Sequence, residues 1–191
     1  MTTPLLLLTV PLSLIPTADL IPTCRKLTQY DGDWLFLKSK TSLVALQLHN
    51  HNNPVSATKE LLHETISPFA SDYSVMTLEP SIGFLSRSGQ TIPPDAYTTI
   101  VKYRTTPGSR GRVIDLCRDL FAFAEREELD VYSLAILDSL DDEDEFVILE
   151  RYQDVDAEKR HLTSDRCVKC LAEIKGMIAG HESTNFDILD V

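Results

Sequence analysis

Apolar positions in the second half of the chain follow two alternating periods. A period of two, with many β-branched and aromatic residues, is typical of a strand, whereas apolar residues recurring at three and four positions are typical of a helix. The expected helix after the third strand is interrupted near Ser164. The predicted order is strand, helix, strand, strand, helix and strand, over residues 97–104, 111–127, 130–140, 146–152, about 154–179 and 184–189. This is the ferredoxin-like β-α-β-β-α-β arrangement.

The first half of the chain repeats this order more loosely. Its predicted segments, again strand, helix, strand, strand, helix and strand, are residues 5–12, 17–30, 34–37, 43–49, 56–69 and 73–78. Residues 43–49 align with residues 146–152, although few identities support the alignment. We interpret the halves as a weak internal repeat in which the first copy is degenerate.

The segment between the halves, residues 81–96, is rich in Ser, Gly and Pro, which favours irregular structure. Phe84 and Leu85 could nevertheless extend the preceding strand. The predicted organisation is therefore a degenerate repeat over residues 1–80, a linker over 81–96 and a second repeat over 97–191.

A single sheet of this type covers only one face with its own helices, and the other face needs a partner. Here the first repeat can supply that partner within the same chain. The expected fold class is α+β, with two ferredoxin-like repeats that form an intramolecular barrel. A homodimer is then optional rather than required.

Charge and composition exclude some partners. The 191 residues are 43% apolar, and 29 acidic against 18 basic residues give a formal net charge of −11. Nucleic acid and anionic membrane surfaces would be repelled, so neither is expected as a partner. The apolar start of the chain lacks a preceding Lys or Arg and is interrupted by prolines, which favours a buried strand over a signal sequence and hence a cytoplasmic protein.

The four cysteines are expected to be reduced and to pack in the interior. Cys167 and Cys170 form a lone CxxC inside a helical pattern, away from the helix start where a redox motif normally lies. No second CxxC or pair of histidines completes a zinc site, so no metal is expected.

Short motifs after the strand at 146–152 carry a family resemblance. They are Glu150-x-Tyr152, Asp156-Ala157, His161-Leu162 and Ser164. With the order of elements, they resemble the antibiotic biosynthesis monooxygenase (ABM) domain, whose fold is a dimeric α+β barrel. Several members of that family oxidise phenols or anthrones with dioxygen and no metal or flavin, so the resemblance implies no cofactor. Two of the three residues of its haem-degrading branch are missing here.

The resemblance and the helical spacing together point to candidate site residues. His161 should face the sheet, and its ordinary pKa near neutrality suits a catalytic base. Tyr152 is the second catalytic candidate, as a donor to the substrate. Glu150, Trp34 and Tyr103 are candidates for contact with the substrate. The alternatives are a structural histidine, a half-buried Tyr152, and an ordinary pairing of Glu150 with Arg151, Lys102 or Arg104, which we favour for Glu150.

The leading functional hypothesis is a cofactor-independent, monooxygenase-like enzyme that acts on an aromatic or polyketide-type small molecule in secondary metabolism. The alternatives are a non-catalytic ligand-binding or scaffold protein and a redox-neutral cyclase or isomerase. A cavity of several hundred Å³ with His161 and Tyr152 on its wall would favour an enzyme, since small-molecule pockets have about that size. A packed core around His161 would favour the scaffold.

Overall fold

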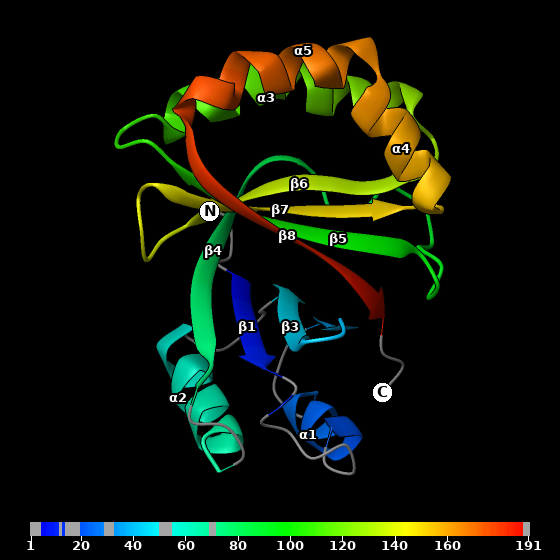
Figure 1. The fold of residues 1–191 in the computed structure, drawn as a ribbon. Helices are drawn as coiled ribbons and strands as arrows, with labels where there is room; N and C mark the ends of the chain where they lie inside the picture. Colours follow the sequence, from blue (N-terminus) through cyan, green and yellow to red (C-terminus); the bar gives the residue numbers. More distant parts are fainter. Residues whose placement is uncertain are drawn as a thin grey trace. The chain divides into compact units, whose positions relative to one another are not determined.

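The computed structural model describes residues 5–11, 13, 20–28, 33–49, 55–68 and 72–188. The chain divides into two compact units, Met1–Glu79 with Asp187–Val191 and Pro80–Phe186 (Figure 1). Two strands, β4 (Ser74–Phe84) and β8 (Ile178–Ile188), each contribute residues to both units. Each unit is described separately below.

The first unit is an antiparallel sheet with two helices. Its elements, besides β4, are β1 (Leu5–Pro11), α1 (Leu20–Leu27), β2 (Asp33–Lys38), β3 (Ser42–His49) and α2 (Val55–Ile66). Strand β3 lies between β1 and β2, and β1 also pairs with β4. Buried side chains of β1 and β3 pack against residues of both helices, including Leu27 and Leu62, to form the core of this unit.

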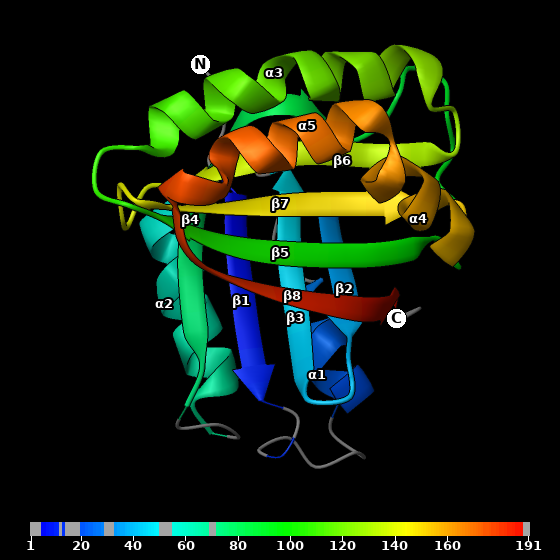
Figure 2. The ribbon, with the colours of Figure 1, turned by 45° about the horizontal axis from the view of Figure 1, so that its top comes forward.

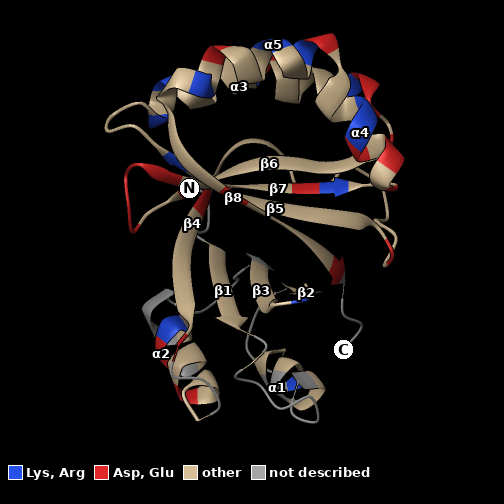
Figure 3. Ribbon diagram, in the orientation of Figure 1, with Lys and Arg blue, Asp and Glu red and all other residues tan. Residues whose placement is uncertain are grey.

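The second unit has the same order of elements, with a longer first helix and a second helix that is divided into two. It contains β5 (Tyr97–Thr105), α3 (Arg110–Glu127), β6 (Val131–Ser139), β7 (Glu145–Tyr152), α4 (Val155–Thr163), α5 (Asp165–Ile174) and the 3-10 turn η3 (Lys175–Met177) before β8. In its sheet, β5 lies between β8 and β7, and β7 lies between β5 and β6. Figure 2 shows α3, α4 and α5 over one face of this sheet, and Figure 3 shows the charged residues of these helices.

The predicted α+β class and the two ferredoxin-like repeats are confirmed by this order of elements. The last strand, however, begins at Ile178 rather than at residue 184, and no helix reaches residue 179. It pairs with β5 from Ile178 opposite Thr105 to Phe186 opposite Thr98. These ladder hydrogen bonds outweigh the weak helical pattern near Gly176 and Gly180, because glycine disfavours a helix interior. The residues predicted as the start of the linker, 81–84, belong to β4.

Side-chain caps define the two helices that follow β7. Asp154 precedes α4, and its carboxylate accepts a hydrogen bond of 2.8 Å from the Ala157 backbone N–H. Ser164 separates α4 from α5, as the sequence predicts. Its hydroxyl donates to the His161 carbonyl (2.8 Å) and accepts from the Cys167 backbone N–H (3.2 Å). The break therefore places His161 in the last turn of α4, over the end of β7.

Arg87 fixes the end of α3 from the loop that follows β4. Its guanidinium donates to the carbonyls of Ala124 (2.9 Å), Glu125 (2.9 Å) and Glu128 (2.8 Å), and also to that of Val131. The Ala124 and Glu128 carbonyls already accept backbone N–H bonds from Glu128 and Val131, so Arg87 adds a charged donor to the turn that ends α3.

Replacing Arg87 by alanine is expected to lower the free energy of unfolding by about 2–4 kcal/mol, because several charge-assisted hydrogen bonds are lost together. Urea denaturation would measure the change. Arg118→Ala is the matched control, since Arg118 is exposed and pairs only with Asp115 one turn away. Such exposed pairs contribute at most about 1 kcal/mol. Equal effects of the two substitutions would contradict the assigned role of Arg87.

Candidate functional site

The helix-facing side of β7 carries an unusual polar pair at its end. Strand alternation places Phe146, Ile148, Glu150 and Tyr152 on this side, where the first two join the apolar core beneath the helices. Glu150 is only 8% exposed and Tyr152 is completely buried. The Tyr152 hydroxyl donates to Glu150 Oε2 at 3.2 Å. A carboxylate is thus held inside an apolar layer with a single phenol as its hydrogen-bonding partner among the described contacts.

The preferred prediction for Glu150, an ordinary pairing with Arg151, Lys102 or Arg104, is wrong. Arg151 lies on the opposite face of β7, where it donates to Ser133 Oγ and the Leu85 carbonyl, both at 2.8 Å. Lys102 and Arg104 pair with Glu145 at the other end of the strand. Strand alternation excludes the first partner, and the antiparallel register of β5 and β7 excludes the other two.

His161 reaches the same region from α4. Its side chain is buried, with 4% exposure, and its ring lies 5.9 Å from the Tyr152 ring, centroid to centroid. His161 Nδ1 is 2.6 Å from Glu128 Oε2. Glu128 directly follows α3, so its contact with His161 links the ends of α3 and α4. The structure therefore brings His161 and Glu150 close to Tyr152.

The surroundings shift the pKa values of Glu150 and His161. Burial raises the pKa of Glu150 to about 7, although the charge of His161 and the hydrogen bond from Tyr152 both oppose the rise. Burial also lowers the pKa of His161, but hydrogen bonds with Cys167 and Glu128 raise it more strongly, to about 10. Near neutral pH, therefore, His161 is an imidazolium, and the Glu150 carboxyl is present in both its protonated and its ionised form.

A small, partly open cavity of about 50 Å³ lies between the sheet and the helices of this unit. Glu150 and His161 are on its wall together with Tyr103, and the rest of the lining is apolar or thiol. The other lining residues are Cys117, Leu120, Phe121, Leu134, Phe146, Ile148, Leu162, Cys167, Cys170, Leu171 and Ile174. This volume holds one or two water-sized molecules, far less than the several hundred Å³ expected for an enzyme pocket, and Tyr152 is not on the wall.

The remaining sequence candidates divide between the units. Tyr103 lines the cavity, and burial together with the charge of Glu150 raises its pKa to about 12. Trp34 lies on β2 in the first unit, where it packs against that unit's core and stacks on Phe36 with ring centroids 6.2 Å apart. It is not among the residues that line the cavity. The sequence pattern makes His49 and His51 a poor metal pair; the His51 position and the His49 side chain lie outside the described residues.

Two features of the site carry no clear sequence signal. Glu128 lies 33 positions before its partner His161, so no short spacing connects them. The sequence predicts that the cysteines pack in the interior as reduced thiols. Cys117, Cys167 and Cys170 are buried and form no disulfide. Their place on the cavity wall depends on how α3 and α5 pack, with the sulfurs of Cys117 and Cys170 only 3.6 Å apart. Among the described side chains, no three His, Cys, Asp or Glu residues are grouped to hold a metal ion.

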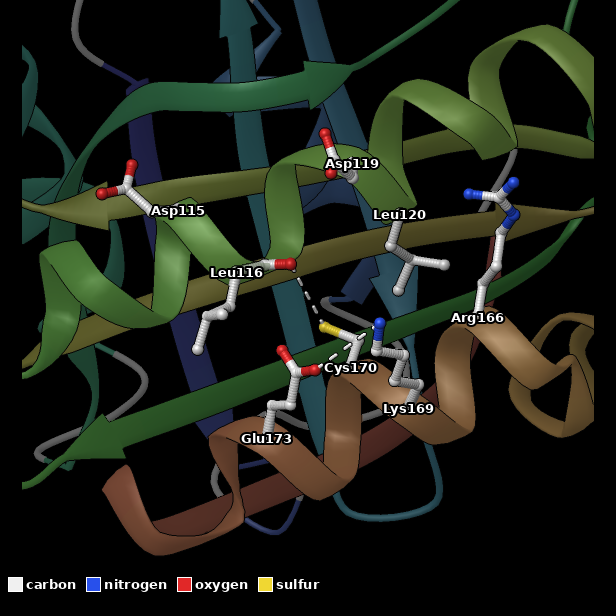
Figure 4. A pocket seen from close by; sticks show the side chains of 8 residues that line it. All are labelled: Asp115, Leu116, Asp119, Leu120, Arg166, Lys169, Cys170 and Glu173. Atoms are coloured by element: carbon white, nitrogen blue, oxygen red, sulfur yellow. Dashed lines mark hydrogen bonds and ion pairs between the residues drawn. The ribbon is translucent and has the colours of Figure 1, made fainter.

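A second hollow, of about 220 Å³, lies between α3 and α5 (Figure 4). Its rim mixes both signs of charge: Asp115 and Asp119 on α3, and Arg166, Lys169 and Glu173 on α5. Lys169 and Glu173 are 3.9 Å apart and pair with each other. Because neither sign predominates, this hollow offers no preference for an ionic ligand, and none of the candidate residues lines it.

The first repeat lacks the central carboxylate of this site. In the alignment of β3 with β7, Gln47 takes the place of Glu150 and His49 that of Tyr152. Gln47 is completely buried, like its counterpart, but it is neutral and cannot accept a proton at neutral pH. At this aligned position, therefore, only the second repeat carries a carboxylate.

Fold and site together define an α+β, ferredoxin-like protein with a buried carboxylate–histidine pair beneath its helices. Residues 96–173 match the family model described as Antibiotic biosynthesis monooxygenase. The match lies within the second unit and confirms the ABM resemblance that its motifs predict. Among the described residues, no helix is long and apolar enough to span a bilayer.

Solved structures with a similar fold cover the whole chain. A "putative monooxygenase" from Fusobacterium nucleatum is 10% identical, with a TM-score of 0.73, and the match covers 99% of this chain and 94% of that one. One from Lactobacillus acidophilus is 12% identical, with a TM-score of 0.69 and coverage of 98% and 100%. An "anthrone oxidase-like protein" is 13% identical, with a TM-score of 0.68 and coverage of 100% and 92%. At such low identity these likenesses show the fold alone. A search of curated proteins found no significant match.

Proposed function

We propose that the second repeat is a cofactor-independent monooxygenase that acts on an aromatic or polyketide-type small molecule, in secondary metabolism. The observation that carries the proposal is the buried Glu150–His161 pair on the wall of an otherwise apolar cavity. Oxidation by dioxygen without a cofactor needs a base that makes an electron-rich anion, and a positive charge to stabilise the oxyanion that follows. The pair supplies both.

The shifted pKa values reverse the roles expected from the sequence. Glu150, with a pKa of about 7, is deprotonated in an active fraction of molecules at neutral pH and acts as the base. His161, held as an imidazolium by Glu128, is the electrostatic stabiliser instead. Tyr152 does not line the cavity, so it is a positioning residue whose hydroxyl orients the Glu150 carboxylate.

The chemistry balances without an added reductant. The Glu150 carboxylate takes a proton from a methylene that is activated by neighbouring carbonyl and aromatic groups. The resulting carbanion gives one electron to dioxygen, and the two radicals combine to form a C–O bond. The peroxide is protonated, with the imidazolium of His161 stabilising its charge. Loss of the second C–H proton with cleavage of the O–O bond then leaves a carbonyl group and water: R₂CH₂ + O₂ → R₂C=O + H₂O.

Activity is expected to follow a bell-shaped pH profile with limbs near pH 7 and pH 10. The acidic limb arises because Glu150 must be deprotonated, and the alkaline limb because His161 must keep its proton. Replacing Glu128 by glutamine keeps a hydrogen-bonding partner for His161 but removes its charge, so the alkaline limb should move to lower pH. Initial rates from pH 6 to 11 would measure both effects. If His161 were the base, activity would instead continue to rise through pH 10, which would contradict the assigned roles.

The test of the function is oxygen uptake with a panel of anthrone-like and phenolic compounds. The wild-type chain should consume one dioxygen for each carbonyl formed. His161→Gln should lower the rate about 10²–10³-fold, the usual cost of removing one group that stabilises an oxyanion. Altered product without oxygen uptake would favour the redox-neutral cyclase or isomerase. The small cavity favours the non-catalytic scaffold alternative, and the absence of both oxygen uptake and product with every compound would support that alternative.

A further inference from the structure

A shallow groove lies on the second unit, beside the small cavity that Glu150 and His161 line. It has a volume of about 500 Å³ and is lined by Tyr103, Leu171, Ile174, Lys175, Ile178 and His181. These residues come from β5, the end of α5, η3 and the start of β8; Figure 2 shows β5 and β8 side by side. The groove is about ten times larger than the cavity and falls within the size range of small-molecule sites.

Groove and cavity share three wall residues: Tyr103, Leu171 and Ile174. The two spaces are thus separated by the thickness of these side chains, of which Tyr103 and Leu171 are partly exposed. Reorientation of a partly exposed side chain is fast and needs no change in the backbone. A molecule seated in the groove therefore needs only these side chains to move for its inner end to reach Glu150 and His161.

Three aromatic rings form a row, of which Tyr103 and His181 line the groove and Phe146 lines the cavity. Tyr103 lies between Phe146 and His181, with ring centroids 5.1 Å from the first and 5.8 Å from the second, and its plane is inclined by only 15° and 26° to theirs. Offset stacking of nearly parallel rings is a favourable geometry for aromatic groups. The row favours a flat aromatic occupant over a saturated one.

The charges select the orientation of such an occupant. Lys175 is exposed at the groove rim, no acidic side chain lines the groove, and no ion pair of Lys175 occurs within the described residues. The inner cavity holds both Glu150 and His161, and the positive charge of His161 is already paired with Glu128, so the cavity offers no second, free cation for a permanent anionic substituent. An anionic substituent is therefore stabilised at the rim and disfavoured inside.

We propose that this groove, defined by Tyr103, Leu171, Ile174, Lys175, Ile178 and His181, is a binding subsite for planar aromatic anions. The flat ring stacks along Tyr103 and His181, a carboxylate or phenolate pairs with Lys175, and the opposite edge of the molecule points past Tyr103 toward the cavity. This assignment extends the proposed function and rests on it in one respect: the edge that points inward is taken as the part of the molecule that is oxidised. It predicts that the substrate carries its negative charge on the side away from the carbon that is oxidised.

The test measures binding and needs no turnover. 2-Naphthoate is titrated into the whole chain by calorimetry without oxygen, with neutral 2-naphthamide as the matched ligand. Lys175→Gln should weaken naphthoate binding about 3–10-fold and leave naphthamide unchanged, as expected for loss of one partly exposed ion pair. Tyr103→Leu keeps an apolar side chain but removes the stacking ring, so it should weaken both ligands. Lys169→Gln makes the same charge change on the α3–α5 hollow and should alter neither.

The outcomes separate this subsite from the proposed reaction. Naphthoate binding that depends on Lys175 and Tyr103, in a chain that consumes no oxygen, would support the subsite and overturn the reaction. Oxygen uptake that is unchanged in Lys175→Gln and Tyr103→Leu, with equal naphthoate affinities, would overturn the subsite and leave the reaction standing. Failure of the wild-type chain to bind naphthoate at millimolar concentration, or an equal effect of Lys169→Gln, would also overturn the subsite.

Discussion

Replacing Glu150 by glutamine is expected to remove activity and to stabilise the protein at neutral pH at the same time. Loss of a general base typically costs about 10²–10⁴ in rate, because the amide cannot accept the proton of the substrate. The same change removes a carboxylate that burial makes unfavourable. The amide occupies nearly the same volume and can still accept the hydrogen bond from Tyr152.

The stabilisation follows from the direction of the pKa shift. The pKa of Glu150 rises from 4.5 to about 7 on folding, so the folded state binds the proton more tightly than the unfolded chain. Below pH 4.5 the carboxyl is neutral in both states and does not lower the free energy of unfolding. As the pH rises from 4.5 to about 7, the cost of burying the ionised group grows, and above about pH 7 it is constant. Relative to wild type, Glu150→Gln should therefore gain about 2–3 kcal/mol more at pH 8 than at pH 5.

Urea denaturation at pH 5 and pH 8, combined with oxygen-uptake rates, measures both effects on one variant. Asp115→Asn is the matched control, because it also neutralises a carboxylate of the same unit but lies exposed on α3. It should leave activity unchanged and alter stability by less than about 1 kcal/mol at either pH. A Glu150→Gln variant that lost stability equally at both pH values would show that Glu150 is a structural group and not a strained base.

The second large effect concerns Gly83, near the end of β4. Its φ of +92° is a conformation that residues with a side chain rarely adopt. A Cβ atom there would lie 2.0 Å from the Leu134 carbonyl oxygen and 2.8 Å from Phe121 Cδ2. Gly83→Ala would thus force the end of β4 away from β6, and we expect a loss of about 3–5 kcal/mol, from overpacking and backbone strain together.

Gly111→Ala is the control for the same chemical change in the same unit. Gly111 lies in the first turn of α3 and has no unusual φ, and a Cβ atom added there would meet no other atom within 4 Å. Alanine is the better helix former, so the substitution should stabilise the chain by a few tenths to about 1 kcal/mol. Thermal or urea unfolding should give opposite signs for the two variants. A mild effect of Gly83→Ala would contradict the close approach of β4 to β6.

The periodicity of the sequence was sufficient to predict the order of elements in both repeats, since each strand and helix buries one face of its own residues. Boundaries were less accurate where long-range pairing competes with local preference. Residues 178–183 show this most clearly: they join the sheet only because β5 presents an edge to them. The family motifs indicated Glu150, Tyr152 and His161, with His161 as the expected base, whereas the burial seen in the structure supports the proposal that Glu150 has this role.

The sequence by itself determined the α+β class, the two repeats, and the side of β7 on which Glu150 and Tyr152 lie, because alternation is a local property of the strand. Only the tertiary structure shows the surroundings of Glu150 and His161, on which the proposed chemistry rests. The pKa of a carboxyl or an imidazole depends on burial and on neighbours far along the chain, here Glu128 and Cys167 for His161. The size of the cavity, and the groove beside it, likewise depend on how helices from distant segments pack over the sheet, which no local pattern encodes.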